Sequence, residues 1–420
     1  MSINKTLFRN FSSLTLIQVS NYLFPLITFP YLVRVLGVEG FGLINFSAAF
    51  IAYFHTLVDY GFTYSATREV SIHRNNKQKL IEIFNAVLLI KFSLIIVSFI
   101  ILFILVTFIP KFNYNRPVYF LTFILVIGRG LSPLWFFQGI EKMKYLLYIS
   151  VIIRALYVIL IFLLVRSSGD LLTAVFLNSA SYLVIGLIAL STAVLIFGIK
   201  FRIPSFEVVK FHFIDSGYIF ISTAAINLYT TTNIFLLGLF TNDAIVGYFA
   251  AADKIRIAVQ GAFSSIAQSI YPHLSKLFNE NLEIALIFVR KVVKYIGLIV
   301  FILSLILFIF AYQIIRLIVG PGYPDSVILL QIIAFLPFII FLSNIAGIQT
   351  MLNLNYKKEF TRIIVIAAIM NIVFSIILIP VFQAIGTAVS MVITEIYVST
   401  AMIIFLKNKG ITLITFNSKM

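Results

Sequence analysis

Residues 92–109, FSLIIVSFIILFILVTFI, form a stretch of eighteen residues without a charged side chain. A helix needs about 20 predominantly apolar residues to cross the hydrocarbon core of a bilayer. The apolar sequence extends N-terminally to residue 80 and is continuous rather than alternating, which argues against a strand of a transmembrane barrel. A transmembrane helix over residues 80–109 is therefore predicted.

Similar apolar runs recur along the whole chain. Pro, Gly, Asn and Asp turns or clusters of Lys and Arg separate them. The predicted spans are 12–35, 41–64, 80–109, 117–138, 145–166, 171–197, 212–238, 243–272, 288–319, 326–352, 360–380 and 384–406. The sequence thus predicts an all-α polytopic membrane protein with about 12 transmembrane helices.

Composition supports this class of protein and argues against several others. The 420 residues are 61% hydrophobic and 11% charged, whereas soluble domains are close to half apolar and a quarter charged. Water-soluble enzymes and nucleic-acid-binding proteins are therefore not indicated. The chain has no cysteine, and its four histidines show no metal-binding spacing, so neither a metal site nor a cofactor is expected.

The net charge of +16 is distributed unevenly between the two sides of the predicted bundle. The termini and the even-to-odd connections carry 21 Lys and Arg residues, against five on the opposite side. Cytoplasmic loops are enriched in Lys and Arg, so both termini are predicted to be cytoplasmic. Most of the positive charge then reflects membrane topology, and no nucleic-acid partner is inferred.

A smaller set of charges lies inside the predicted spans. It comprises the cations Lys91, Arg129, Arg154, Lys254 and Arg256 and the acids Asp59, Asp253 and Glu395. Each costs about 2.5–3.5 kcal/mol at the centre of a membrane helix, which favours a functional role for the group. The excess of cations predicts an anionic ligand.

Polar residues also form stripes along particular spans. Asp253, Arg256 and Gln260 share one face of the span 243–272. The spans 12–35, 41–64 and 212–238 carry comparable polar positions, which include Gln18, Asn21, Asn45 and Asn227. These four spans are the first two of each half, so we expect two six-helix bundles, residues 1–205 and 206–420, with a central binding site.

Several blocks resemble a known family. Residues 21–42, NYLFPLITFPYLVRVLGVEGFG, are similar to polysaccharide repeat-unit flippases of the Wzx type, as are residues 53–68, 134–143 and 246–255. Those flippases share a superfamily with the multidrug and toxin extrusion (MATE) transporters. The resemblance implies a MATE-like pair of bundles in the bacterial inner membrane.

The resemblance also implies a function without enzymatic chemistry. Such a protein moves an oligosaccharide, linked through pyrophosphate to undecaprenol, from the cytoplasmic to the periplasmic leaflet by alternating access. O-antigen, capsule or related polymers are then built from it. Its expected partners are membrane lipids and the polymerase and chain-length proteins of the same pathway.

Two interpretations remain open for each candidate residue. Lys254 and Arg256 are expected either to bind the pyrophosphate or to pair with Asp253 and Glu395. Arg129 and Arg154 either line the cavity or make structural contacts. Polar candidates for glycan contact are Gln18, Asn21, Asn45, Asn227 and Gln260.

Further alternatives concern gating and ion coupling. Arg34 is a candidate for the exit gate or an interfacial anchor, and Lys91 is expected to reach toward the cytoplasmic interface. Asp59, Asp253, Glu395 and His55 are candidates for ion coupling, with ion pairing or interior hydrogen bonding as the alternative.

Two other functions are also considered. A drug or small-molecule antiporter would share the fold, but a cationic substrate favours an acidic interior. A membrane glycosyltransferase or polymerase acting on polyprenyl-linked sugars would need a long external loop bearing catalytic residues, and no predicted connection is long enough.

Overall fold

The computed structural model describes the backbone of residues 2–413 and the side chains in that range other than 2–22, 222, 225–230, 262, 264, 265, 268 and 272. All the regular elements of the described residues are helices, which confirms the predicted all-α membrane fold. Its elements are α1 (Ser2–Asp59), α2 (Phe62–Ile72), α3 (Lys77–Phe108), α4 (Pro110–Asn113), α5 (Arg116–Leu131), α6 (Leu134–Gly139), α7 (Lys144–Leu164), η1 (Ser168–Asp170), α8 (Leu171–Leu195), α9 (Phe206–Phe240), α10 (Asp243–Glu280), α11 (Leu282–Ile309), α12 (Ala311–Ile318), α13 (Asp325–Ile333), α14 (Leu336–Asn344), η2 (Ile345–Met351) and α15 (Lys357–Asn408).

Helix α1 is a hairpin rather than one straight rod. Gly37 has φ 70° and ψ −179°, a backbone conformation that is essentially restricted to glycine. The rings of Phe29 and Phe41, on either side of it, have centroids 5.6 Å apart. Twelve residues of straight helix would extend about 18 Å, so the chain must reverse at Gly37. The predicted spans 12–35 and 41–64 are the two arms of this hairpin.

Helix α15 reverses in the same way at Gln383, where φ is 50° and ψ is −125°. Asn371 donates a hydrogen bond to Thr394 across 3.4 Å, and the hydroxyls of Ser375 and Ser390 are 3.1 Å apart. These pairs match residues equally distant from the reversal, as expected for antiparallel arms. The predicted spans 360–380 and 384–406 therefore pack on each other.

Helix length and apolarity indicate where the chain crosses the membrane. Within the described residues, eight stretches are long and apolar enough to cross, and two of them, Leu23–Ile72 and Lys357–Asn408, contain the hairpins. The predicted spans 212–238 and 243–272 coincide with α9 and α10, which are not among these eight. The total of twelve spans and the cytoplasmic location of the termini remain predictions.

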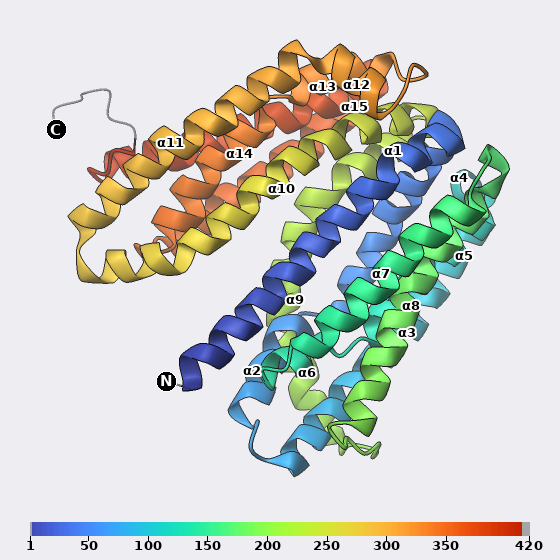
Figure 1. Cartoon of the computed structure of the whole chain (residues 1–420), viewed down its shortest axis with the longest axis vertical. Helices are drawn as coiled ribbons and strands as arrows, with labels where there is room; N and C mark the ends of the chain where they lie inside the picture. Colours follow the sequence, from blue (N-terminus) through green and yellow to red (C-terminus); the bar gives the residue numbers. More distant parts are fainter. Residues whose placement is uncertain (1, 414–420) are drawn as a thin grey trace. The chain divides into compact units, whose positions relative to one another are not determined.

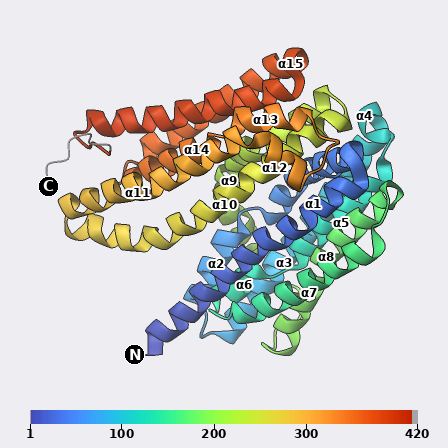
Figure 2. The same cartoon turned by 45° about the horizontal axis from the view of Figure 1, so that its top comes forward.

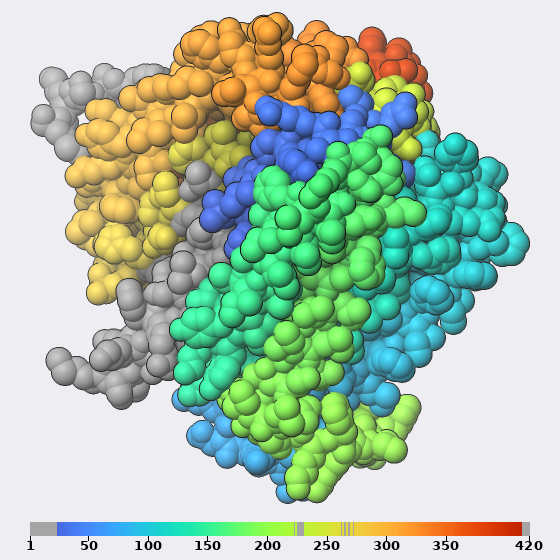
Figure 3. Space-filling view, turned by 45° about the vertical axis from the view of Figure 1, so that its right-hand side comes forward, coloured from blue at the N-terminus to red at the C-terminus, as the bar shows by residue number. Residues whose placement is uncertain are grey.

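The outer surfaces of the helices are apolar, as a lipid environment requires. Helices α7 and α8 form much of the surface seen in Figure 3 and expose Ile152, Ile159, Leu163, Phe176 and Leu187. Such a face would be unfavourable in water but is solvated by lipid chains. Backbone hydrogen bonds within each helix satisfy the polar groups that lipid cannot.

The chain divides into two compact units, Met1–Thr231 and Thr232–Met420. In the first, α5 packs closely on α8, and α1 packs on α5 and α7 (Figure 1). In the second, α10, α11, α14 and α15 lie side by side (Figure 2). The domain boundary predicted after residue 205 remains a prediction, because the helix that follows it, α9, contributes to both units.

Candidate functional site

Three basic side chains, one acid, one histidine and one tyrosine meet inside the first unit. We call this set the interior charge cluster and define it as His55, Asp59, Lys91, Arg129, Arg154 and Tyr182. The residues come from five helices: α1, α3, α5, α7 and α8. The cluster thus depends on tertiary packing rather than on a local sequence motif.

Two arginines contact the same aromatic ring. The guanidinium carbon of Arg129 lies 4.6 Å from the centre of the Tyr182 ring, and that of Arg154 lies 5.1 Å from it. An aromatic face attracts cations, so Tyr182 holds two like charges near each other that would otherwise repel. The Nε atom of Arg154 is buried and has no hydrogen-bond partner among the described residues. A buried donor of this kind can bind an anionic oxygen.

Glycines on both sides of Arg129 determine its position. A Cβ atom on Gly128 would lie 2.4 Å from the backbone of Tyr182, and one on Gly186 would lie 2.1 Å from the Gly128 carbonyl oxygen. Helices α5 and α8 therefore touch backbone to backbone, as small residues allow in membrane bundles. A Cβ on Gly130 would meet Ile95 of α3 at 2.7 Å. The sequence Gly128-Arg129-Gly130 thus fixes the arginine where α5 packs against both α8 and α3.

Lys91 does not reach the cytoplasmic interface, so the expectation for this residue is wrong. It is only 4% exposed, and its Nζ atom lies 3.7 Å from Oδ1 of Asp59. The same carboxylate oxygen accepts a hydrogen bond of 2.9 Å from Thr63. Burial of a lysine needs a counter-charge, and Asp59 on the neighbouring helix supplies it. Of the two interpretations of Asp59, ion pairing is the one observed.

His55 links the ion pair to the arginines. It lies one helical turn before Asp59 and within electrostatic range of both Arg129 and Lys91. The cluster therefore contains three cations and one carboxylate, which leaves a formal charge of +2 when His55 is neutral. An anion is the ligand that such a site favours.

The polar stripe on α10 forms a second, electrically balanced group in the other unit. Arg256 donates a hydrogen bond of 2.6 Å to Asp253, and both side chains are nearly buried. The Arg256 guanidinium also donates to the side-chain oxygen of Gln260. The predicted pairing with Asp253 is therefore observed, and phosphate contact by Arg256 remains a prediction. The adjacent Lys254 is half-buried.

The remaining candidates are dispersed. The Asn45 amide donates to the Phe41 carbonyl of its own helix at 2.8 Å. Arg34 is exposed three residues before the Gly37 reversal, and Glu395 is half-buried on the second arm of α15. Gln18, Asn21 and Asn227 lie outside the residues whose side chains the structure describes. Roles for all six remain predictions.

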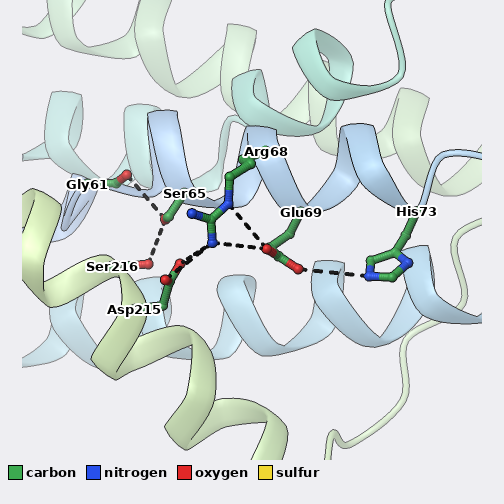
Figure 4. Close-up of polar contacts among 7 residues, drawn as sticks. All are labelled: Gly61, Ser65, Arg68, Glu69, His73, Asp215 and Ser216. Atoms are coloured by element: carbon green, nitrogen blue, oxygen red, sulfur yellow. Dashed lines mark hydrogen bonds and ion pairs between the residues drawn. The ribbon is translucent and has the colours of Figure 1, made fainter.

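A polar contact between α2 and α9 was not anticipated from the sequence. Figure 4 shows the Arg68 guanidinium between Glu69 and Asp215, which it approaches to 3.1 and 3.2 Å. Beside it, the buried hydroxyls of Ser65 and Ser216 are 2.7 Å apart. Arg68 lies in the predicted connection between the spans 41–64 and 80–109, and this part of the chain is the helix α2. The acidic residues Glu69 and Asp215 are the sequence feature that could have indicated this contact.

No metal centre emerges from the parts of the chain that are described, because they contain no group of three or more His, Cys, Asp or Glu able to hold an ion. The ionisable groups inside the bundle form pairs or cation–aromatic contacts instead. An all-helical membrane fold with charged groups buried between its helices is typical of a transporter.

Solved structures agree with this class. The chain matches an inward-facing multidrug resistance transporter of the MATE family with a TM-score of 0.73 and 14% identity, over 94% of this chain and 98% of the other. It also matches the inward-closed conformation of the lipid II flippase MurJ with a TM-score of 0.53 and 15% identity, over 97% of this chain and 86% of that one. The fold is therefore that of the MATE transporters.

Sequence comparisons define the family within that class. The chain belongs to the family described as "Polysaccharide biosynthesis protein", which matches residues 7–278. It is 38% identical to a protein of Escherichia coli (strain K12) named "Putative O-antigen transporter", over 97% of this chain and 99% of that protein. A protein of Shigella dysenteriae with the same name is 28% identical over 93% and 97%. The predicted family membership is thereby confirmed, and the protein is a multi-pass transporter of the bacterial inner membrane.

Proposed function

We propose that this protein flips oligosaccharide repeat units, linked to undecaprenyl pyrophosphate, from the cytoplasmic to the periplasmic leaflet for O-antigen or a similar polysaccharide. The names of its relatives and the MurJ-like fold support a lipid-linked saccharide as cargo. The polyprenyl tail stays in lipid while the bundles alternate access to the polar headgroup. Catalysis of bond formation is not part of this function.

The interior charge cluster is the observation that carries the proposal. The pyrophosphate is the charged part of the cargo, and moving it through hydrocarbon without counter-charges is prohibitive. Arg129 and Arg154 converge on Tyr182, and Arg154 retains a buried donor without a partner. We assign the binding of the pyrophosphate to these two arginines.

The same charges disfavour the export of cationic drugs. A cationic substrate would meet three basic groups and a single carboxylate, and that carboxylate is already paired with Lys91. Electrostatic complementarity therefore selects an anionic headgroup. Hydroxyl and amide groups along the predicted cavity are left to contact the glycan.

Reconstitution into vesicles tests the proposal directly. Purified protein is incorporated with fluorescent undecaprenyl-pyrophosphate-linked oligosaccharide, and movement between leaflets is followed by a quencher that cannot cross the bilayer. A cationic dye serves as the competing substrate in parallel vesicles. Flipping of the lipid-linked oligosaccharide without dye transport is expected, and the reverse pattern would refute the assignment.

A matched pair of variants locates the binding group. A hydrogen bond to a charged partner contributes about 1.5–3 kcal/mol, which corresponds to a loss of roughly 10–150-fold in flipping for Arg129→Gln. Arg116→Gln on the same helix is the control, because Arg116 is exposed and donates a local hydrogen bond to Asn113. Equal rates for the two variants would remove Arg129 from the site.

A further inference from the structure

We infer that Asp59 is a resident counter-ion for Lys91 that competes with the cargo pyrophosphate and so promotes its release. The inference rests on the proposed function and adds a step to it. It assigns Lys91 to the binding of cargo and gives Asp59 a role in turnover. Both residues belong to the first unit.

The geometry places the two charges unequally. The Lys91 side chain is 5% exposed, whereas that of Asp59 is 27% exposed, and their charged atoms are 3.7 Å apart. An anion that approaches Lys91 therefore meets the carboxylate first. The separation exceeds the 2.7–2.9 Å of a tight charge-assisted hydrogen bond, so Lys91 is not fully engaged by Asp59.

Asp59 has a second partner to which it can remain bonded. Thr63, which lies just after Asp59 at the start of α2, donates a hydrogen bond of 2.9 Å to Oδ1 of the carboxylate. When a phosphate oxygen takes over Lys91, Asp59 keeps this bond rather than losing all its partners. When a phosphate replaces Asp59 at Lys91, the carboxylate thus still has a hydrogen-bond donor.

Charge balance explains why a carboxylate is needed in a site that binds an anion. The three cations and Asp59 leave a charge of +2, and each phosphate of a pyrophosphate diester brings one negative charge. The loaded cluster is therefore neutral with Asp59 in place. Without Asp59 the cluster would retain one excess positive charge, so it would hold the cargo more tightly.

When no cargo is bound, the cluster needs Asp59 to balance the positive charge of Lys91. After release, Lys91 would be a buried cation without a partner, which is costly in a medium of low dielectric constant. Asp59 compensates that charge until the next headgroup arrives. A residue that both weakens cargo binding and stabilises the empty site raises the rate of the whole cycle.

Binding and flipping measured on the same variants test this inference. The probe is radiolabelled polyprenyl-pyrophosphoryl-N-acetylglucosamine, with the protein in nanodiscs at pH 8 so that His55 is neutral. We expect Asp59→Asn to bind the probe at least fivefold more tightly and to flip it about tenfold more slowly. Lys91→Met is expected to bind at least fivefold more weakly.

A double variant distinguishes charge from other effects of the substitutions. Asp59→Asn with Lys91→Met restores the charge of +2, and its affinity is expected within about twofold of the wild type. Glu82→Gln is the control, since this acid on α3 pairs at 2.8 Å with the exposed Lys79 outside the cluster. It is expected to leave both binding and flipping unchanged.

The comparison remains decisive if Asp59→Asn alone does not fold. In that case the double variant is compared with Lys91→Met. The double variant, which also lacks the acid, is expected to bind the probe about fivefold more tightly than Lys91→Met does. Unchanged or weaker binding on removal of Asp59 would overturn the inference while the proposed function stands. Failure of the wild type to bind or flip the probe would instead refute the proposed function itself.

Discussion

The contact between Gly128 and Gly186 predicts the effect of a single methyl group on the site. A Cβ on Gly186 would lie 2.1 Å from the Gly128 carbonyl oxygen, whereas carbon and oxygen normally approach no closer than about 3.3 Å. Gly186→Ala must therefore push α5 and α8 apart by about 1 Å. Overpacking of this kind costs about 1–3 kcal/mol.

The expected consequence is a loss of both stability and flipping. For a unit of this size, 1 kcal/mol corresponds to about 2–4 °C in Tm, so Gly186→Ala should lower Tm by about 2–12 °C. Tyr182 lies on the displaced helix, so its contact with Arg129 should lengthen and flipping should fall. Thermal unfolding of purified protein in detergent, followed by tryptophan fluorescence, measures the first effect.

A control glycine makes the reasoning refutable. Gly322→Ala adds the same methyl group where nothing lies within 4 Å, so Tm should change by less than about 1 °C. If Gly186→Ala were as stable and as active as Gly322→Ala, the close packing of α5 on α8 could not be what positions Arg129.

Three further predictions concern other parts of the chain. Gly37→Ala would place alanine in a backbone conformation that is essentially restricted to glycine, so it should destabilise the α1 hairpin by about 1–3 kcal/mol and lower Tm. An unchanged Tm would contradict the reversal at this residue. At the contact between α2 and α9, Arg68→Ala should lower the free energy of unfolding by less than about 1 kcal/mol because the arginine is half exposed. Ser65→Val at the buried hydroxyl pair should lower it by more, and the opposite order in denaturant unfolding would refute this ranking. Burial raises the pKa of Tyr323 above its ordinary value of 10.0. Above about pH 10 the phenol therefore stays neutral in the folded state but ionises in the unfolded chain, so the contribution of Tyr323 to stability should be intact below about pH 10 and fall above it. Tyr323→Phe should flatten that fall in Tm between pH 9 and 11, and an equally steep fall would assign the effect to another group.

Apolar length and charge placement were enough to predict the membrane fold and the approximate position of its helices. The predicted span 145–166 corresponds to α7, Lys144–Leu164, and 80–109 corresponds to α3, Lys77–Phe108. The agreement has a simple cause. In lipid, each helix must satisfy its own backbone hydrogen bonds, so a helix is encoded locally.

The candidate site was only partly predictable. Arg129 and Arg154 stood out because charge is costly in a membrane, but their common partner Tyr182 is an aromatic residue in an apolar run and carries no such signal. The glycines beside Arg129 are the sequence feature that could have indicated a close helix contact. Pairing of Asp253 with Arg256 was predictable, because residues three apart share a helix face.

The sequence by itself determined that this chain is a helical membrane protein with an excess of interior cations, because hydropathy and formal charge are properties of individual residues. Only the tertiary structure decided how those charges are arranged. It showed that Lys91 pairs with Asp59 instead of reaching the interface, and that two arginines share one tyrosine. These contacts join helices far apart in sequence, and they depend on packing distances of a few ångströms that no local pattern encodes.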